Sequence, residues 1–512
     1  MIFPPGRLRA YAFKNVEPAD EFSSNLTHTT SPEALLALAV QLYSRKPERA
    51  FLLTIGGASF DHADVPSEPV RAAIRAALGL IKAALCGISL PETPFRSQNT
   101  LTQHAYAFLP LSSLCYRLLV PFMFSQRTNW KLSPNRFTQA LEAIRASGTK
   151  LLDLSVSNPT ECGFQYDAGA ILSAFQNPNA LSYDPQPKGL LSAREEVARY
   201  YLRDHHVSVD PESIILTTST SEAYSYVFCL LCNPQDEILV PKPSYPLFDF
   251  LADLQNVTLT PYSLEYAHGW MVDFLSITRA LSERTRAILL VHPNNPTGSY
   301  LRAEEVQELN NLCRERNLAL IVDEVFLDYS FTGRPPRTFT ANLDSLTFTL
   351  GGLSKIAALP QMKVAWVAIT GPGSLLRSAL GRLEVIADTY LSLNAPTQCS
   401  VPTLLEQRHS LQPQLLQRVR GNRASLQKLI SSQPTCELLD ADAGWYAVLR
   451  VPARGSDEDL VIDLLQKQNV VVHPGHFYDF PKDGYLVLSL ITPTEIFHEG
   501  ISRLVKFLHA IS

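Results

Sequence analysis

The segment Arg286-Ala-Ile-Leu-Leu-Val-His-Pro-Asn-Asn-Pro-Thr-Gly298 joins a short apolar run to a turn rich in Pro and Asn. An apolar run of this length that ends in such turn residues is typical of a fully buried strand. We therefore expect a strand at Arg286–Val291, followed by a rigid turn that presents an Asn amide.

Comparable apolar runs recur on both sides of this segment, separated by stretches long enough for helices. They lie at Ser213–Thr217, Glu237–Val240, Ala319–Val322, Ser345–Leu350 and Val364–Thr370. Strands that alternate with helices imply an α/β fold, in which a largely parallel sheet is flanked by helices on both faces.

The pattern changes after about Leu404. A long helical stretch leads into strand-like runs at Gly444–Val451, Val470–Gly475 and Tyr485–Leu490, which predicts a smaller C-terminal α+β domain. Near the start, a helix, a short strand in Ala50–Gly57 and a second helix are too small a set to close a sheet. The expected division of the chain is 1–88 as a partial α/β segment forming a short N-terminal extension, 89–128 as a linker, 129–403 as an N-terminal segment with a large domain, and 404–512 as the small domain.

Composition narrows the class of protein. The 512 residues are 46% hydrophobic and 18% charged, which is typical of a globular chain. The formal charge is -5 and no basic stripe is interleaved with aromatic residues, so nucleic acid is not an expected partner. Only Ala105–Phe124 approaches membrane length, and its central Arg117 alone costs roughly 2.5–3.5 kcal/mol on insertion scales, so we expect no membrane partner either.

Cysteine usage bears on the compartment. The chain has eight cysteines, scattered without the regular spacing of a disulfide framework, and its first residues lack the apolar block of a secretory signal. A reducing cytoplasm is therefore the expected location. Cys229 and Cys232 form a C-x-x-C pair, but no second pair or His cluster accompanies them, and we expect no metal site.

Polar residues that follow the expected strands are candidates for chemistry, because ligands of open α/β sheets bind at the carboxyl ends of the strands. The strand that ends at Thr217 is followed by Thr218-Ser-Thr-Ser-Glu-Ala223 and a helix, which by geometry and dipole is a phosphate site. Asp323 ends a buried apolar run, and Lys355 follows Gly351-Gly-Leu-Ser.

The order of these segments matches a known family. Read along the chain, S-x-S-E-A, P-S-Y-P, N-N-P-T-G, V-D-E-V and G-L-S-K resemble the class I/II aminotransferases, which have pyridoxal-5'-phosphate (PLP) fold type I. The resemblance covers about residues 123–512. It implies a PLP-dependent transaminase that moves an amino group between an amino acid and a 2-oxo acid through a Schiff base at Lys355. A PLP-dependent lyase or decarboxylase on the same fold, and a non-catalytic PLP-binding regulator, are the alternatives.

The resemblance assigns the catalytic roles. Lys355 matches the Schiff-base lysine, whose amine also moves the proton between the substrate Cα and the cofactor. Asp323 matches the carboxylate beside the pyridine nitrogen, and Tyr245 matches the aromatic residue that stacks on the ring. Asn295 matches the residue that hydrogen-bonds the 3'-oxygen of the cofactor, next to the substrate.

Further matches concern the phosphate, the partner subunit and the substrate. Ser219, Thr220 and Ser221 match the phosphate cup. Tyr183 matches a tyrosine that reaches the phosphate from the neighbouring subunit, which implies a homodimer. Ser157 matches the place where the N-terminal segment of the family meets the substrate.

The sequence departs from the family at three places. Phe326 replaces a tyrosine three residues after Asp323, so one phenol hydrogen bond is lost. Lys363 replaces the phosphate-binding arginine, keeping the charge without the bidentate fork. Val487 stands where most relatives carry the arginine that binds the substrate α-carboxylate, and a valine cannot do this. Either another cation takes over, with Arg450 as our candidate and His473 or His476 as alternatives, or the substrate is not a conventional α-amino acid.

The first hundred residues carry a separate, weaker resemblance. Residues 28–85 resemble the C-terminal half of hydrogenase maturation endopeptidases, in which a His at the position of His28 is a nickel ligand. The acidic ligands expected upstream have no counterpart here, and a lone His cannot form a closed metal site. The interpretation is a remnant of a gene fusion.

Overall fold

The computed structural model describes residues 8–12, 51–55, 124–331, 337–431, 436–453 and 455–511. It divides into two compact units, Met1–Met123 and Phe124–Ser512. In the first unit, β1 (Leu8–Ala12) pairs antiparallel with β2 (Phe51–Ile55), which confirms the strand expected in Ala50–Gly57. The flanking helices that we expected there lie outside the described residues.

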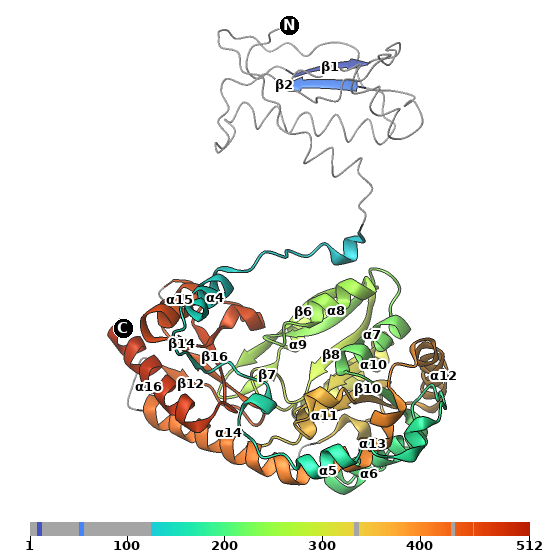
Figure 1. Ribbon diagram of the computed structural model, residues 1–512. Helices are drawn as coiled ribbons and strands as arrows, with labels where there is room; N and C mark the ends of the chain where they lie inside the picture. Colours follow the sequence, from blue (N-terminus) through green and yellow to red (C-terminus); the bar gives the residue numbers. More distant parts are fainter. Residues whose placement is uncertain are drawn as a thin grey trace, which may run out of the picture. The chain divides into compact units, whose positions relative to one another are not determined.

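An eight-stranded sheet forms the centre of the second unit (Figure 1). All of the expected strands are present, and two more lie at one edge. In spatial order the strands are β4 (Ile214–Thr217), β11 (Ala365–Thr370), β10 (Thr347–Gly352), β9 (Ala319–Asp323), β8 (Thr285–Val291), β5 (Glu237–Lys242), β6 (Thr258–Tyr266) and β7 (Trp270–Val272).

The sheet is largely parallel, as expected. The run β10-β9-β8-β5-β6 is parallel, whereas β11 is antiparallel to both of its neighbours and β7 is antiparallel to β6. The two strands that the sequence did not predict, β6 and β7, lie at an edge. Much of β6 is solvent-accessible and it contains Pro261, so it lacks the continuous apolar pattern of its neighbours.

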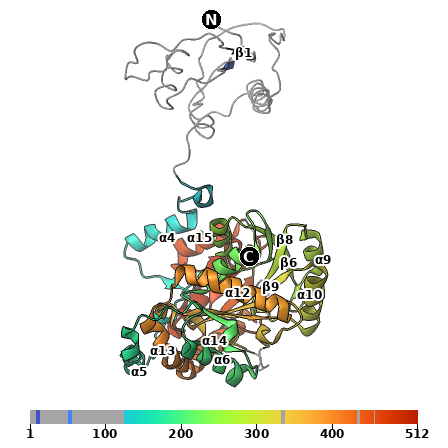
Figure 2. The same cartoon turned by 90° about the vertical axis from the view of Figure 1, so that its right-hand side faces the viewer.

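Helices cover both faces of this sheet (Figures 1 and 2). On one face, α7 (Thr220–Leu231), α8 (Phe248–Gln255) and α12 (Gly373–Tyr390) pack in one apolar core with Val240, Leu289 and Ile321. On the other face, α9 (Phe274–Ala280) and α10 (Ala303–Arg316) pack with Leu239, Ile288 and Leu320. Successive strand residues point to opposite faces, which explains why these strands are apolar throughout.

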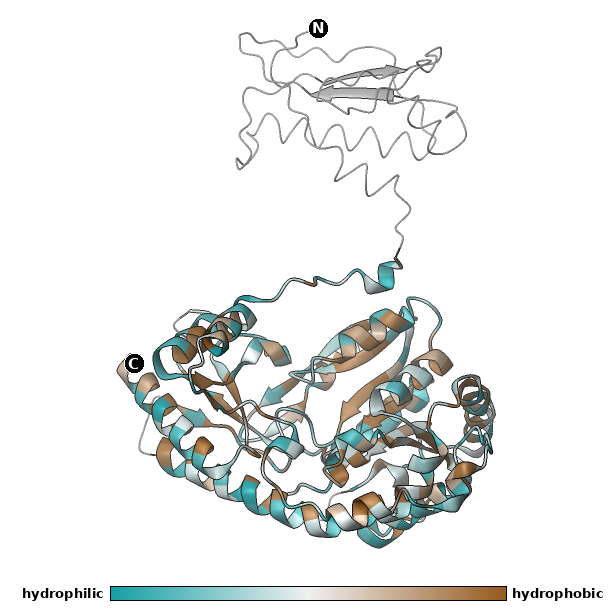
Figure 3. Ribbon diagram, viewed as in Figure 1, coloured by the Kyte–Doolittle hydropathy of each residue, from teal (hydrophilic) through white to brown (hydrophobic). Residues whose placement is uncertain are grey.

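The third apolar core of the large part lies at the β4 edge. Here α6 (Leu191–His205), α13 (Ala395–Glu406) and the short α5 (Ala168–Ser173) pack against Leu216 and Trp366. In Figure 3 the apolar residues are concentrated on the strands of the central sheet and on the inner sides of the helices.

The small C-terminal part is joined to the large part by α14 (Arg408–Ile430), which runs along one edge of the molecule (Figure 1). Its sheet has the order β12 (Glu437–Leu438), β13 (Tyr446–Arg450), β16 (Tyr485–Ser489) and β15 (His473–Pro474). Around it lie α4 (Arg136–Ala146), α15 (Asp457–Gln468) and α16 (Thr494–Ile511), and β3 (Leu152–Asp153) pairs with β14 (Val470–Val471). The expected C-terminal α+β architecture is confirmed.

Among the described residues, no helix is both long and apolar enough to cross a membrane. All but the last residue of the Ala105–Phe124 segment lies outside that part of the chain.

Candidate active site

Three of the expected site residues meet at the carboxyl edge of the central sheet. Asp323, the last residue of β9, pairs in register with Val291 of β8 and with Leu350 of β10. The chain leaves β8 toward Asn295 and leaves β10 toward Lys355, so both residues follow strands that flank Asp323. The topology therefore brings an amine, a carboxylate and an amide to one edge of the sheet.

Lys355 lies in α11 (Leu353–Ile356), a single helical turn that directly follows β10. Its Nζ lies 4.7 Å from the centroid of the Trp445 ring and 5.4 Å from that of Phe326. A Cβ at Gly351 would come within 2.7 Å of the Trp366 side chain, so glycine is needed for β10 to reach this turn. Burial lowers the pKa of Lys355 to about 8, although the charge of Asp323 opposes this shift.

This lowered pKa leads to a prediction for the cofactor-free protein. The amine of Lys355 should be protonated below about pH 8 and neutral above it, so its labelling by an amine-acylating reagent should rise with a midpoint near pH 8. Exposed lysines should show midpoints near the ordinary value of about 10.4. Peptide-resolved mass spectrometry measures both in one sample. A midpoint for Lys355 that coincides with those of the exposed lysines would contradict the burial described above.

Asp323 is buried and is held from two sides. The Tyr224 hydroxyl donates to its Oδ2 at 2.9 Å, and the backbone N–H of Val325 donates to its Oδ1 at 3.0 Å. Burial raises the pKa of Asp323, while these two hydrogen bonds and the Lys355 amine lower it. A fixed carboxylate of this kind can hold a protonated ring nitrogen. Tyr224 lies on α7 and no sequence pattern pointed to it.

Asn295 stands in a turn that the small part of the molecule holds in place. Gly298 has φ +70°, and a Cβ there would come within 2.3 Å of the Ala443 carbonyl oxygen. The Gly298 carbonyl accepts hydrogen bonds from the backbone N–H groups of Asp442 and Ala443. Oδ1 of Asn295 is buried without a hydrogen-bond partner among the described residues. The turn thus presents an unsatisfied amide beside Asp323.

The phosphate site expected from the sequence lies at the start of α7. Ser219 is the N-cap, and its Oγ accepts a hydrogen bond from the Glu222 N–H at 3.2 Å. The first N–H groups of a helix have no acceptor within the helix, so those of Thr220 and Ser221 are suited to an anion. Thr217, the last residue of β4, pairs with Ala365, the first of β11, so Ser219 and the exposed Lys363 both lie just beyond the same end of this strand pair.

Tyr245 and Ser157 approach the same region. Tyr245 keeps 42% of its surface exposed. Burial and the charge of Asp323 both raise its pKa, so Tyr245 lies close enough to that carboxylate to interact with its charge. Ser157 is hydrogen-bonded to Tyr446 of β13, whose pKa is raised to about 12, mainly by burial. Tyr446 faces the same side of the small sheet as Ser489, its direct cross-strand partner.

Two expected residues lie apart from this cluster. Tyr183 is 86% exposed and borders a cavity that Tyr226, Leu391 and Asn394 also line. Arg450 is exposed, forms an ion pair with Glu437, and lies 6.0 Å from the centroid of the Tyr266 ring.

The departures from the family pattern have clear positions. Phe326 packs against Trp445 with ring centroids 5.3 Å apart, so the hydroxyl that it lacks leaves an apolar wall beside Lys355. Val487 is buried at 1% exposure and pairs directly with Val448 and His473. The face where relatives carry an arginine is therefore occupied here by packed apolar and ring side chains.

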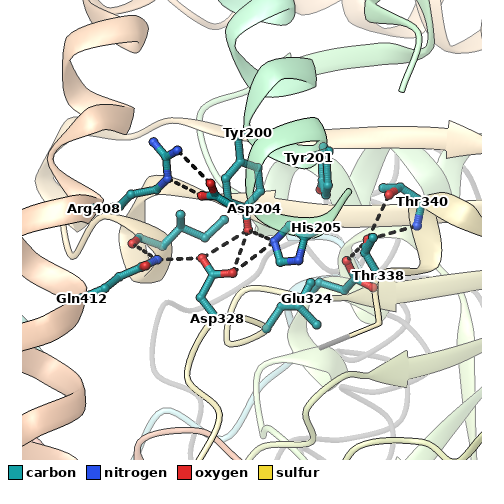
Figure 4. Close-up of polar contacts among 12 residues, drawn as sticks. Tyr200, Tyr201, Asp204, His205, Glu324, Asp328, Thr338, Thr340, Arg408 and Gln412 are labelled. Atoms are coloured by element: carbon teal, nitrogen blue, oxygen red, sulfur yellow. Dashed lines mark hydrogen bonds and ion pairs between the residues drawn. The ribbon is translucent and has the colours of Figure 1, made fainter. Parts of the chain in front are cut away.

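Behind the lysine turn lies a buried polar network that the sequence did not reveal (Figure 4). Asp328 accepts hydrogen bonds from the Tyr200 hydroxyl at 3.1 and 3.2 Å and from Nε2 of Gln412 at 2.6 Å. Nε2 of His205 lies 3.1 Å from the Asp328 carboxylate. Although burial opposes the charged form of His205, the hydrogen bond and charge of Asp328 raise its pKa.

Comparison with known proteins agrees with this geometry. The family model "Aminotransferase class I and II" matches residues 127–498. The glutamate-pyruvate aminotransferase AlaA of Haemophilus influenzae is 27% identical over 377 residues, covering 72% of this chain and 93% of that protein. An alanine aminotransferase of Mycobacterium tuberculosis is 28% identical over 375 residues, covering 71% of this chain and 87% of its own length.

Solved structures give the same result for the fold. An aminotransferase from Escherichia coli superposes with a TM-score of 0.68 at 25% identity, covering 76% of this chain and 98% of its own. An alanine aminotransferase from Pyrococcus furiosus superposes with a TM-score of 0.69 at 22% identity, covering 76% and 100%. The resemblance of residues 28–85 to a hydrogenase maturation endopeptidase is not supported by these comparisons.

Proposed function

We propose an active site centred on Lys355 for this chain, which belongs to the class I and II aminotransferases. The protein is a transaminase that uses PLP to move an amino group between an amino acid and a 2-oxo acid. Family membership thus favours transamination over the lyase and regulator alternatives. The observation that supports our assignment of residues is the meeting of Lys355, Asp323 and Asn295 at the ends of three adjacent strands.

The residues at this edge fit the cofactor. The free N–H groups of α7, with Ser219, Thr220, Ser221 and Lys363, suit a phosphate dianion. A buried carboxylate at Asp323 suits a protonated pyridine nitrogen. Nδ2 of Asn295 would be the donor to the 3'-oxygen, and its Oδ1 has no partner among the described residues. In our proposal the start of α7 would hold the phosphate of PLP, and Asp323 and Asn295 would hold the polar atoms of its ring.

Bound PLP supplies an electron sink for the bonds at the substrate Cα. In our proposal Asp323 keeps the proton on the pyridine nitrogen, because its carboxylate is fixed by Tyr224 and Val325. The Lys355 amine, which its lowered pKa leaves about half neutral near pH 8, would hold PLP and could move a proton at the substrate Cα. Trp445 and Phe326 pack beside this amine and exclude water from it.

For the substrate, we infer an amino acid of the kind that the names of the relatives give, with alanine or glutamate as donor. Because Val487 cannot bind the substrate α-carboxylate, other groups must bind it. Ser157 and Asn295 are the neutral side chains near the site that could do so. The test is the absorbance spectrum of the PLP-loaded protein after each amino acid of a panel is added alone. Conversion of the cofactor to its amine form, with release of the matching 2-oxo acid, supports transamination. Release of a product with the cofactor unchanged would indicate lyase or decarboxylase chemistry instead.

We also propose a homodimer in which Tyr183 reaches the neighbouring active site. Tyr183 is 86% exposed. Other large side chains are exposed as well: Leu181 lies near it in sequence, and Val385 and Tyr390 lie on α12. Apolar surface of this kind is typical of protein interfaces.

A reducing compartment such as the cytoplasm suits Cys162 and Cys313, which are buried as thiols.

Hybrid dimers test the shared site. A mixture of Lys355→Ala and Tyr183→Ala subunits should regain activity that neither variant has alone, because one site of each hybrid combines an intact Lys355 with an intact Tyr183. Random pairing makes half of the dimers hybrid, each with one intact site, so about a quarter of the wild-type activity is expected. If Tyr183 instead served its own subunit, no hybrid site would be intact and mixing would restore nothing.

A further inference from the structure

The turn that carries Lys355 is held by side chains from three distant segments. Three backbone carbonyls of residues 355–358 each accept a hydrogen bond from a side chain, and that of Lys355 also accepts one from the Ala358 N–H. Lys355 O accepts from the Tyr329 hydroxyl at 2.5 Å, Ile356 O from Nε2 of Gln412 at 2.8 Å, and Ala358 O from the Tyr166 hydroxyl at 2.9 Å. The last carbonyls of any helix lack partners within it, and α11 is a single turn, so these bonds decide how the turn is oriented.

Gln412 differs from the two tyrosines because its amide nitrogen serves two acceptors. Nε2 donates to Ile356 O and also, at 2.6 Å, to Oδ2 of Asp328 (Figure 4). A primary amide has two N–H donors, so one nitrogen can satisfy both acceptors, and the pair of bonds fixes its rotamer. Asp328 is fixed in turn by Tyr200 and His205.

The surroundings of Asp328 make this anchor rigid. Its side chain is 9% exposed and that of His205 is 1% exposed. The aromatic ring of Tyr200 lies 5.5 Å from the guanidinium carbon of Arg408, which is bonded to Asp204 at 2.6 Å. Asp328 is bonded to the buried side chains of Tyr200, His205 and Gln412, and a buried carboxylate held in this way resists displacement, because a shift would leave its charge unpaired.

We propose that Gln412 is a positioning residue for Lys355, which sets the direction of the lysine amine by tying the carbonyl of Ile356 to the anchored Asp328. The inference rests on the proposed role of Lys355. Gln412 touches neither substrate nor cofactor, and it acts through the backbone of the turn. A neutral amide is the side chain that suits this place, since glutamate would set a second carboxylate against Asp328, whereas leucine would take the side-chain donor from Ile356 O and one of several donors from Asp328.

The experiment compares Gln412→Leu with Gln414→Leu in the full chain. Gln414 lies on the same helix and makes a matched pair of bonds, to the backbone N–H and carbonyl of Gln165, but none to the lysine turn. A misplacement of about 1 Å at a reacting group costs on the order of 10²-fold in rate. We expect kcat per bound PLP to fall by about 10- to 100-fold in Q412L with KM changed little, and to stay near wild type in Q414L.

A second readout is independent of turnover. In the cofactor-free protein, the acylation rate of Lys355, resolved by mass spectrometry, should change in Q412L and not in Q414L. A double variant with Asp328→Asn should lose less than the sum of the two single effects, because both residues act on one contact. If Q412L does not fold, Gln412→Asn, which keeps the amide but shortens its reach, takes its place.

The outcomes separate cleanly. Loss of thermal stability in Q412L, with kcat per bound PLP and Lys355 labelling both unchanged, would overturn the inference and leave Gln412 a structural residue. A wild-type protein that shows no lysine-bound PLP would instead defeat the proposed function. In that case the labelling of Lys355 would still decide whether Gln412 orients the turn.

Discussion

Lys355→Ala should lose turnover by at least about 10²–10⁴-fold, the usual share of a general acid–base group, together with its covalent bond to the cofactor. No other described lysine lies between the Trp445 and Phe326 rings, so no second amine can take its place. The measurements are single-turnover rates with alanine or glutamate and the mass of the PLP-labelled peptide after borohydride reduction. Wild type should carry the label on the peptide that contains Lys355, and the variant should carry none.

Lys363→Ala is the matched control for this experiment. Lys363 is an exposed lysine only eight residues away, and its proposed role is to offset the charge of the phosphate. Its loss should weaken PLP binding while the label on Lys355 persists. A reduced adduct that moves to another lysine in K355A, with activity retained, would show that the wrong amine had been assigned.

Asp323→Asn should lower kcat by about 10²–10³-fold, the cost of removing one preorganised electrostatic partner. The amide keeps the shape of the side chain, but it carries no charge with which to hold a proton on the pyridine nitrogen. The experiment compares kcat at saturating PLP with the affinity for PLP measured by fluorescence quenching. A fall in kcat that is much larger than the fall in affinity is expected, because the charge matters most while electrons flow into the ring.

Glu324→Gln provides the control for this second variant. Glu324 follows Asp323 directly and is also buried, but its carboxylate accepts from the Thr338 hydroxyl at 2.7 Å and the Phe339 N–H at 2.6 Å, away from the lysine. Burial raises the pKa of Glu324 to about 7, so its neutral form is already half populated at that pH. E324Q should therefore leave kcat near wild type. Equal losses in D323N and E324Q would mean that the general loss of a buried acid, rather than contact with the ring, explains both.

The sequence predicted the parts of the fold whose signals are local. The central strands that we expected are mostly apolar runs between turn residues, and each of them is a strand in the structure. Strand β6, next to the edge strand β7, was not predicted, because its exposed polar residues and Pro261 resemble a loop. The common location of Lys355, Asp323 and Asn295 could be predicted because a parallel sheet gathers the residues that follow its strands at one edge.

The residues that surround this core of the site could not be predicted in the same way. Trp445 reaches the Lys355 amine across 90 positions of sequence, and Gln412 reaches Ile356 across 56. Contacts between residues so far apart in sequence depend on how the large part and the small C-terminal part pack together. No local sequence pattern encodes that packing. Arg450 was selected for its nearness in sequence, but four strand residues after Tyr446 correspond to about 13 Å, which places it at the opposite end of β13.

Helix α14 has a mechanical consequence. Its 23 residues extend for about 34 Å, from the turn of Lys355 in the large part to the strands of the small C-terminal part. Near one end of the helix, Gln412 donates to the carbonyl oxygen of Ile356 in that turn. Further along, Asn422 donates to the carbonyl oxygens of Leu490 and Thr492, just beyond β16. The two contacts lie ten residues apart on one helix, which corresponds to about 15 Å along its axis. A displacement of the small part relative to the large part would therefore strain the bond between Gln412 and the lysine turn.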